Sequence, residues 1–519
     1  MSSTTTYVRA QEAPPMRLPR TRSRYRPRPR PRHRCAVAAL LLLPVAAACS
    51  ATGGADPDQG AHAPADGAAV DDKGRAKPPV TDFNGDGYAD LAVPAAGSDV
   101  GAAKGTGSVS VVYGGAEGVQ LPRRKQVFSA ASDDAVGRLL RTGTGAAATG
   151  FGSQSAAADL DGDGNTDLLL SLDGNGDTRS GPKTVVLWGS RVGLGSPILL
   201  PPVAPRPGDF DGDGHIDLLA HGHDGREGMF VLRGPFRRDG KPAGSTEVRG
   251  GDWGDATGPG AVTVGDLNGD RYDDVVTAQG FEEERYKDYF FKGGPDGLSA
   301  KVADLDAYNA LGAVGDFDCD GVGDLAVQES GKAADAEETG PPRIQVLRGS
   351  TSAAPSGART LDVPGAAGVT GEDTDVALAA ADVDDDGCAD LAVGVPGAAG
   401  GGAVTLLKGG AQGLSGAGAR TFTQNSPGVP GNAEAGDLFG GAVRFADFDK
   451  DGHQDLAVGA PGEDGAEPDS GAVWILDGTA RGPEARPDGL SFGPEALLAP
   501  VKGAGAARNP GTGFGAAFR

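Results

Sequence analysis

Asp82-Phe-Asn84-Gly-Asp86-Gly-Tyr88-Ala-Asp90-Leu is the first of seven copies of one short acidic pattern in this 519-residue chain. Positions 1, 3, 5 and 9 of each copy carry a carboxylate or amide oxygen, which is the donor set of a cage for a hard cation. A glycine at position 6 allows a sharp turn, so that the carbonyl of position 7 can also point inward. We number the copies acidic loops 1 to 7, and they span residues 82–90, 159–167, 209–217, 266–274, 316–324, 382–390 and 447–455.

The pattern predicts up to seven structural Ca²⁺ sites. Together the loops hold 26 carboxylates in clusters of three or four, and such clusters are costly without a counter-ion. A solvated Asx turn without metal is the alternative interpretation of a single copy. The predicted ligands are Asp82, Asn84, Asp86, Tyr88, Asp90, Asp159, Asp161, Asp163, Asn165, Asp167, Asp209, Asp211, Asp213, His215, Asp217, Asp266, Asn268, Asp270, Tyr272, Asp274, Asp316, Asp318, Asp320, Val322, Asp324, Asp382, Asp384, Asp386, Cys388, Asp390, Asp447, Asp449, Asp451, His453 and Asp455.

These loops are not EF-hands, which require a glutamate at position 12 and a flanking helix on each side. Position 12 is Val93, Leu170, Ala220, Thr277, Val327, Val393 and Val458 in turn. Short apolar runs such as Asp390-Leu-Ala-Val-Gly follow position 9, and these are typical of strands buried on both faces. Each acidic loop is therefore predicted to be a turn that enters a β-strand.

The loops recur at spacings of 50 to 77 residues, which fits four strands and their turns. In six repeats a second apolar run ending in glycine follows, as in Ala472-Val-Trp474-Ile-Leu-Asp-Gly478. No useful window shows helical periodicity. The spacing therefore favours one propeller blade per repeat, and an all-β fold.

Phe151-Gly152 and Phe439-Gly440 stand eight residues before loops 2 and 7, and Gly459-Ala-Pro461 follows loop 7. With the aspartate-rich loops, these motifs resemble the FG-GAP (VCBS) repeats of the integrin α-subunit propeller and its bacterial relatives, over about residues 80–519. The resemblance implies a seven-bladed β-propeller with calcium loops on one face and partner contacts usually on the other.

The chain ends predict how the ring closes. Residues 80–82 enter loop 1 directly from a proline-rich segment, where a Phe-Gly strand would be expected. Residues 512–519 supply Phe514-Gly515 and end three positions before the next loop would begin. We expect the C-terminal segment to pair with the N-terminal blade and so remove an open sheet edge. A broken-off eighth blade is the alternative.

Residues 1–48 differ in kind from the rest. An Arg/Pro-rich stretch precedes the 13-residue apolar run 36–48 and then Cys49, as in a secretory signal too short to span a membrane. The cysteine after three alanines resembles a bacterial lipobox, which implies lipidation of Cys49 and a lipid anchor on the outer face of the membrane. Cleavage after an alanine, with release, is the alternative, and Met16 is an alternative start to Met1.

Residues 49–79 are rich in Gly, Ala, Asp and Pro and predict a flexible tether.

Charge and cysteines bound the environment and the partners. The whole chain carries −24, and because residues 1–48 contribute +9, the remainder carries −33. Nucleic acid is therefore excluded as an expected partner. No oligomer is implied. Cys319 and Cys388 lie in loops 5 and 6, and we expect that adjacent blades could bring them within disulfide distance in an oxidising compartment.

Loop 4 is expected to bind metal most weakly. It has Arg271 where the others have glycine, which costs about 1 kcal/mol of strain, and it carries one carboxylate fewer than most loops.

No catalytic motif stands out: there is no G-x-S-x-G, H-E-x-x-H or Walker-type Gly-Lys-Ser/Thr sequence. His221-Gly-His223-Asp224 is more typical of a polar turn than of a transition-metal site, and Leu361-Asp-Val-Pro364 is a short chance match to an adhesion peptide.

We therefore expect a non-catalytic binding or adhesion-type module on the cell surface. Its unidentified protein or glycan ligand would meet the long loops 94–107, 328–342 and 462–471. The alternative is an extracellular sugar-binding or polymer-processing enzyme with a site in the central channel.

Overall fold

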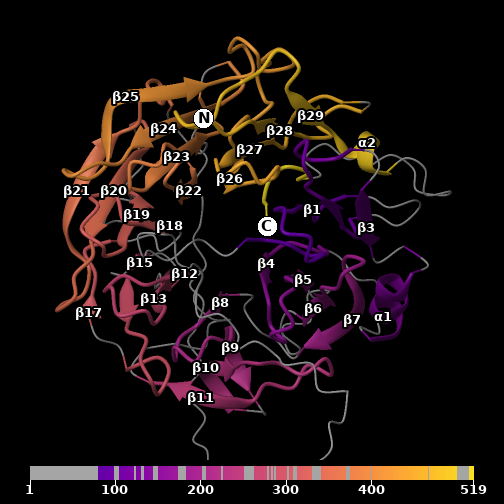
Figure 1. The fold of residues 1–519 in the computed structure, drawn as a ribbon, viewed down its shortest axis with the longest axis vertical. Helices are drawn as coiled ribbons and strands as arrows, with labels where there is room; N and C mark the ends of the chain where they lie inside the picture. Colours follow the sequence, from indigo (N-terminus) through magenta and orange to yellow (C-terminus); the bar gives the residue numbers. More distant parts are fainter. Residues whose placement is uncertain are drawn as a thin grey trace, which may run out of the picture. The chain divides into compact units, whose positions relative to one another are not determined.

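Seven antiparallel sheets follow one another along the chain and are arranged around a ring, as Figure 1 shows. The computed structural model describes residues 80–518 except 99–104, 122–123, 130–131, 133, 144–149, 173–182, 201–205, 224–225, 250–261, 278–279, 282–283, 286–287, 301–302, 308–311, 330–339, 370–374, 399, 466 and 499–512. All described residues belong to the unit His62–Arg519. The expected signal segment, Cys49 and tether lie outside them.

Each sheet is one blade, and in blades 2 to 7 the acidic loop joins the first strand to the second. Blade 1 contains β1 (Leu91–Ala95), β2 (Ser108–Val112) and β3 (Lys125–Ser129), and blade 2 contains β4 (Ser155–Ala158), β5 (Asp167–Leu172), β6 (Lys183–Trp188) and β7 (Gly195–Leu200). Blade 3 contains β8 (Pro207–Gly208), β9 (Asp217–His223), β10 (Arg226–Arg233) and β11 (Gly244–Val248). Blade 4 contains β12 (Val262–Gly265), β13 (Asp274–Thr277), β16 (Tyr289–Phe291) and β17 (Ala303–Asp304), with the hairpin β14 (Gly280–Phe281) and β15 (Glu284–Arg285) inserted.

The last three blades repeat this order. Blade 5 contains β18 (Gly312–Gly315), β19 (Asp324–Gln328), β20 (Arg343–Arg348) and β21 (Ser356–Asp362). Blade 6 contains β22 (Ala377–Ala381), β23 (Asp390–Val395), β24 (Ala403–Lys408) and β25 (Ser415–Phe422). Blade 7 contains β26 (Ala442–Ala446), β27 (Asp455–Ala460), β28 (Ala472–Leu476) and β29 (Leu490–Phe492). The predicted seven-bladed, all-β propeller is confirmed.

The strands that enter from the acidic loops are deeply buried, and in blades 2 to 7 they are inner strands of the sheet. Strands β1, β5, β23 and β27 are buried along their whole length, because both faces pack against neighbouring blades. First strands of consecutive blades contact one another, as β18 contacts β22 and β22 contacts β26. The core is therefore a series of apolar layers between adjacent blades.

Two short helices and one strand were not expected from the sequence. Helix α1 (Ala135–Gly143) buries Val136 and Leu140 in the apolar layer shared by blades 1 and 2, and α2 (Pro494–Leu498) follows β29. Strand β16 of blade 4 is only three residues long, too short for its pattern to identify it. In the described part of the chain, no helix is long and apolar enough to span a membrane.

The ring closes by side-chain packing and hydrogen bonds rather than by the expected terminal strand. Blade 1 has three strands, and the described residues 513–518 contribute no fourth. Phe514 and Phe518 instead pack in one apolar cluster with Leu91 of β1 and Val473 of β28. The amide of Ala89 donates to the carbonyl of Asp447 at 3.2 Å. Blades 7 and 1 are therefore joined directly.

Candidate metal centres

The aspartate at position 9 of every acidic loop fixes the loop to its own blade. One of its oxygens accepts a hydrogen bond from a glycine amide, at 2.6–3.0 Å in all seven blades. This glycine follows β2 in blade 1 and the third strand in blades 2 to 7. In six blades the other oxygen accepts from the amide of position 2, at 2.8–3.4 Å. These aspartates are at most 4% exposed, so each is a buried structural link.

The aspartate at position 1 shapes the turn itself. Its Oδ2 accepts from the amide of position 6 in all seven loops, at 2.6–3.1 Å. The Oδ1 of position 5 accepts from the amide of position 7 in all seven, at 2.9–3.2 Å. Asx-type hydrogen bonds thus account for the shape of the turn, as the interpretation as an Asx turn predicts. The side chain at position 3 contributes least to holding the turn.

Five loops bring three carboxylates close enough to share a cation. Within each of these groups, one oxygen from every residue lies within 4.8 Å of the others. The groups are Asp159, Asp161 and Asp167; Asp209, Asp211 and Asp213; Asp316, Asp318 and Asp320; Asp382, Asp384 and Asp386; and Asp447, Asp449 and Asp451. Several of the predicted sites are therefore geometrically able to bind a metal ion.

Loops 1 and 4 form no such group, and both have asparagine at position 3. The Asn268 amide donates to Asp274 Oδ2 at 2.7 Å, and the Asn84 amide lies 3.5 Å from Asp90 Oδ2. In these two loops the asparagine side-chain amide lies beside the position 9 carboxylate. Loop 1 therefore lacks a group of three carboxylates, as loop 4 does.

Burial and neighbouring acids raise the pKa of every position 9 aspartate. Desolvation is the largest cause, and the other carboxylates of the same loop add to it. The pKa rises to about 8 for Asp90 and Asp167, about 7 for Asp217, Asp390 and Asp455, and about 6 for Asp274 and Asp324. A bound cation would relieve this cost by favouring the ionised forms.

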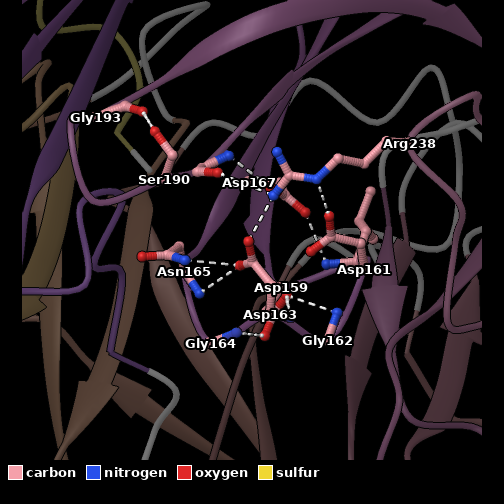
Figure 2. A network of polar contacts seen from close by, with 12 residues as sticks. Asp159, Asp161, Gly162, Asp163, Gly164, Asn165, Asp167, Ser190, Gly193 and Arg238 are labelled. Atoms are coloured by element: carbon pink, nitrogen blue, oxygen red, sulfur yellow. Dashed lines mark hydrogen bonds and ion pairs between the residues drawn. The ribbon is translucent and has the colours of Figure 1, made fainter. Parts of the chain in front are cut away.

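Buried oxygens without partners test whether the loops fit a cation. In loop 2, shown in Figure 2, Asp161 has a side chain only 9% exposed, and its Oδ1 is buried with no hydrogen-bond partner. The Oδ1 of Asp384 in loop 6 and the Oδ2 of Asp217 in loop 3 are likewise buried without a hydrogen-bond partner. Since unpaired buried carboxylate oxygens are costly and hard cations prefer oxygen ligands, these loops fit a calcium-type ion.

Position 4 adds a constraint that the sequence analysis missed. All seven residues there have positive φ, including Cys319 (61°), Asp385 (57°) and Lys450 (59°). The other four are glycine, which adopts this conformation without strain. Position 6 behaves as predicted, and Arg271 takes φ 71°. The glycines at position 4 of loops 1 to 4 were the available signal.

Position 4 of each loop contacts position 7 of the next loop around the ring. A Cβ on Gly85 would lie 2.3 Å from Asn165 Oδ1, so the two loops are tightly packed there. Equivalent contacts join Gly162 to His215, Gly212 to Tyr272 and Gly269 to Val322. The remaining three join Cys319 to Cys388, Asp385 to His453 (3.5 Å) and Lys450 to the Tyr88 ring (5.8 Å).

The fifth of these junctions is a disulfide. Cys319 and Cys388 are bonded, with their Cα atoms 4.8 Å apart, which settles a pairing of loops 5 and 6 that the sequence allowed but left open. The last junction, between Lys450 and Tyr88, lies where blade 7 meets blade 1. His215 and His453 therefore serve as contacts between loops.

The other candidate residues contribute no defined site. Residues 99–104, 330–339 and 466 of the predicted partner loops, and the side chains of His221 and His223, lie outside the described residues. Leu361 and Asp362 end β21 and pair with β20. A shallow cavity of about 370 Å³ beside loop 5 is lined by Asp318, Arg348 and Arg359, among others.

Comparison with protein families identifies the repeats. The FG-GAP repeat matches residues 78–112, 376–407 and 439–476, and the FG-GAP-like repeat matches residues 202–277. The chain thus contains FG-GAP repeats, built into a seven-bladed β-propeller. Loops 2 and 5 lie outside the matched segments, yet their position 1 and position 9 hydrogen bonds are those of the other loops, so the structure extends the repeat to all seven blades.

No curated protein matches the sequence. Among solved structures, the Dos1 propeller is 9% identical, with 61% of this chain and 66% of that chain covered and a TM-score of 0.34. A Bacillus licheniformis rhamnogalacturonan lyase is 13% identical (73% and 64% covered, TM-score 0.28), and a Bacillus subtilis glycoside hydrolase family 43 arabinoxylan arabinofuranohydrolase is 12% identical (74% and 79% covered, TM-score 0.26). The chain spans slightly less than two thirds of the first two.

Proposed function

We propose that this protein is a calcium-stabilised, non-catalytic binding module that acts outside the cytoplasmic membrane, held there by a lipid on Cys49. The observation that carries the proposal is the set of five loops in which three carboxylates lie within 4.8 Å. Calcium fits a hard, flexible, all-oxygen donor set. Its role is structural, because the loops join strands within a blade and contact the next loop.

Two observations support a location in an oxidising compartment and a non-catalytic role. The Cys319–Cys388 disulfide is typical of proteins outside the reducing cytosol. Strongly raised carboxylate pKa values often mark active sites. Here they belong mainly to position 9 aspartates, whose oxygens accept hydrogen bonds from backbone amides, as Asp455 does from Gly478 and Phe448. Their shifts therefore come from structural burial.

The binding role is tested with the mature chain, beginning at residue 49, on a glycan array and against purified surface proteins, with calcium present. We expect saturable binding to one ligand class that is lost when calcium is removed, because chelation would loosen the blades. Incubation with extracellular polysaccharides should release no product. Turnover of a polymer would contradict the proposal and favour the enzyme alternative.

A further inference from the structure

The residue directly before the glycine that donates to the position 9 aspartate lies beside the acidic loop of its own blade. We call it the strand-end residue. From blade 1 to blade 7 it is Tyr113, Trp188, Arg233, Lys292, Arg348, Lys408 and Asp477. Because the next residue donates to the position 9 aspartate in every blade, the strand-end side chain is held at the same place relative to each loop.

In blades 3 to 6 the strand-end residue is basic and binds an acid of its own loop. Arg233 lies 3.5 Å from Asp211, and Lys292 lies 2.8 Å from Asp270. Arg348 contacts Asp318, and Lys408 contacts Asp384.

In blades 1 and 2 the strand-end residue is aromatic, and an arginine from a hairpin supplies the charge. Arg124 donates to Asp86 at 2.8 Å. Arg238 bridges Asp161 and Asp163 at 2.5 Å each (Figure 2) and lies over the Trp188 ring, 5.8 Å from its centroid. Six of the seven loops are therefore each paired with one side-chain cation.

Blade 7 reverses the charge. Its strand-end residue is Asp477, which adds a fifth carboxylate beside Asp447, Asp449, Asp451 and Asp455. Gly478, the residue after Asp477, donates its amide to Asp455 at 2.6 Å, which holds Asp477 next to the loop. Among the described residues no basic side chain forms an ion pair with the four loop acids; Arg486 pairs instead with Asp477 at 2.9 Å.

We propose that the strand-end residue sets the divalent-cation affinity of each acidic loop. An arginine or lysine there neutralises part of the cage and competes with an incoming ion, whereas Asp477 makes loop 7 the tightest site. This inference rests on the proposed function, since it ranks loops already taken to bind cations. It extends the ranking from the sequence, which singled out loop 4 alone as the weakest site.

Loops 6 and 7 provide a matched pair for the test. Both carry four aspartates at positions 1, 3, 5 and 9, and both have a non-glycine residue with positive φ at position 4, Asp385 or Lys450. Their blades have the same strand order. The two loops differ in charge at position 4, where each side chain contacts the next loop, and at the strand end, Lys408 against Asp477, which is the difference that the swaps test.

The experiment is calcium titration by isothermal calorimetry of the metal-free mature chain at low ionic strength, where screening is weakest. The unaltered chain should show one tight site and weaker ones. Asp477→Lys should weaken the tight site roughly tenfold or more, and Lys408→Asp should create a second tight site, because each swap changes the local charge by two units. Asp449→Asn with Asp451→Asn should abolish the original tight site and so assign it to loop 7.

Two charge swaps at exposed positions away from the loops are the controls. Asp362→Lys and Lys241→Asp, whose side chains are 91% and 74% exposed, should leave the tight site unchanged. Asp477→Asn, a milder substitution, should lower the affinity by less than Asp477→Lys and guards against misfolding. Calcium binding that both strand-end swaps leave unaltered would overturn this inference alone, whereas no binding by the unaltered chain would also contradict the proposed function.

Discussion

The backbone conformation at two positions limits which residues the acidic loops can carry. Positions 4 and 6 both lie in the left-handed region, which favours glycine. The non-glycine residues at position 4 are those with a bonded or charged partner in the next loop: Cys319 in a disulfide, Asp385 with His453, and Lys450 over Tyr88. Among the described residues, the Arg271 side chain at position 6 makes no such contact, so its left-handed strain is not offset.

Replacing Arg271 with glycine should therefore stabilise the protein by about 1 kcal/mol, through relief of left-handed strain. The measurement is the free energy of unfolding in urea. The reverse change, Gly321→Arg in loop 5, is the matched control: Gly321 has φ 88° and no atom near its missing Cβ, so it should lose a similar amount from strain alone. Equal stability of all three proteins would contradict this explanation.

At position 9, removal of one carboxylate should be far more damaging. Asp455→Ala leaves the amides of Gly478 and Phe448 buried without acceptors, at a cost of roughly 2–4 kcal/mol. Asp362→Ala, at an exposed site on β21, should change the unfolding free energy by less than about 0.5 kcal/mol. Comparable losses from both substitutions would show that position 9 is not a structural link.

At the scale of elements, the acidic loops do more than end their own strands. Each loop touches the next one around the ring, through position 4 of one and position 7 of the other. The amide of position 8 also donates to the carbonyl of position 1 in the preceding loop, as Thr166 does to Asp82 and Ala389 to Asp316, at 2.8 Å each. A loop ordered by a cation thus also orders the junction between two blades.

The disulfide makes one of these junctions covalent. Cys319 and Cys388 are separated by 69 residues, so their bond closes a long loop in the unfolded chain. We expect the Cys319→Ala, Cys388→Ala double variant to lose about 2–4 kcal/mol of unfolding free energy. A chain that begins at residue 50 contains no cysteine besides these two. After unfolding, it should show two thiols to a thiol reagent only when a reductant is added; two free thiols without reductant would contradict the pairing.

At the scale of the whole molecule, the fold was largely predictable and the metal centres only partly so. Seven loops entering buried strands predicted seven blades, because that signal is local to each repeat. The C-terminal segment was expected to meet blade 1, but its apolar packing through Phe514 was not. The strand-end cations and the contacts between loops could not be predicted, since they join residues that only the folded ring brings together. Helix α1 and β16 were missed because short elements carry little periodic signal.

The raised pKa values give the metal-free propeller an unusual pH dependence. An unfolded aspartate has a pKa near 3.9, whereas the position 9 aspartates have values of about 6 to 8. Between these limits the folded state binds more protons than the unfolded state, so its stability falls as the pH rises from about 4 to about 8. Urea unfolding of metal-free protein should therefore give a lower midpoint at pH 8 than at pH 5.5. A higher midpoint at pH 8 would contradict this account.

The central claim is that cations in the acidic loops hold the blades together. The most direct test is the melting temperature of the mature chain at pH 7.5, measured in EGTA and again after calcium is restored in excess. The account predicts a lower melting temperature in EGTA and full recovery with calcium, because binding to the folded state alone adds to its stability. A melting temperature that chelation leaves unchanged would contradict it.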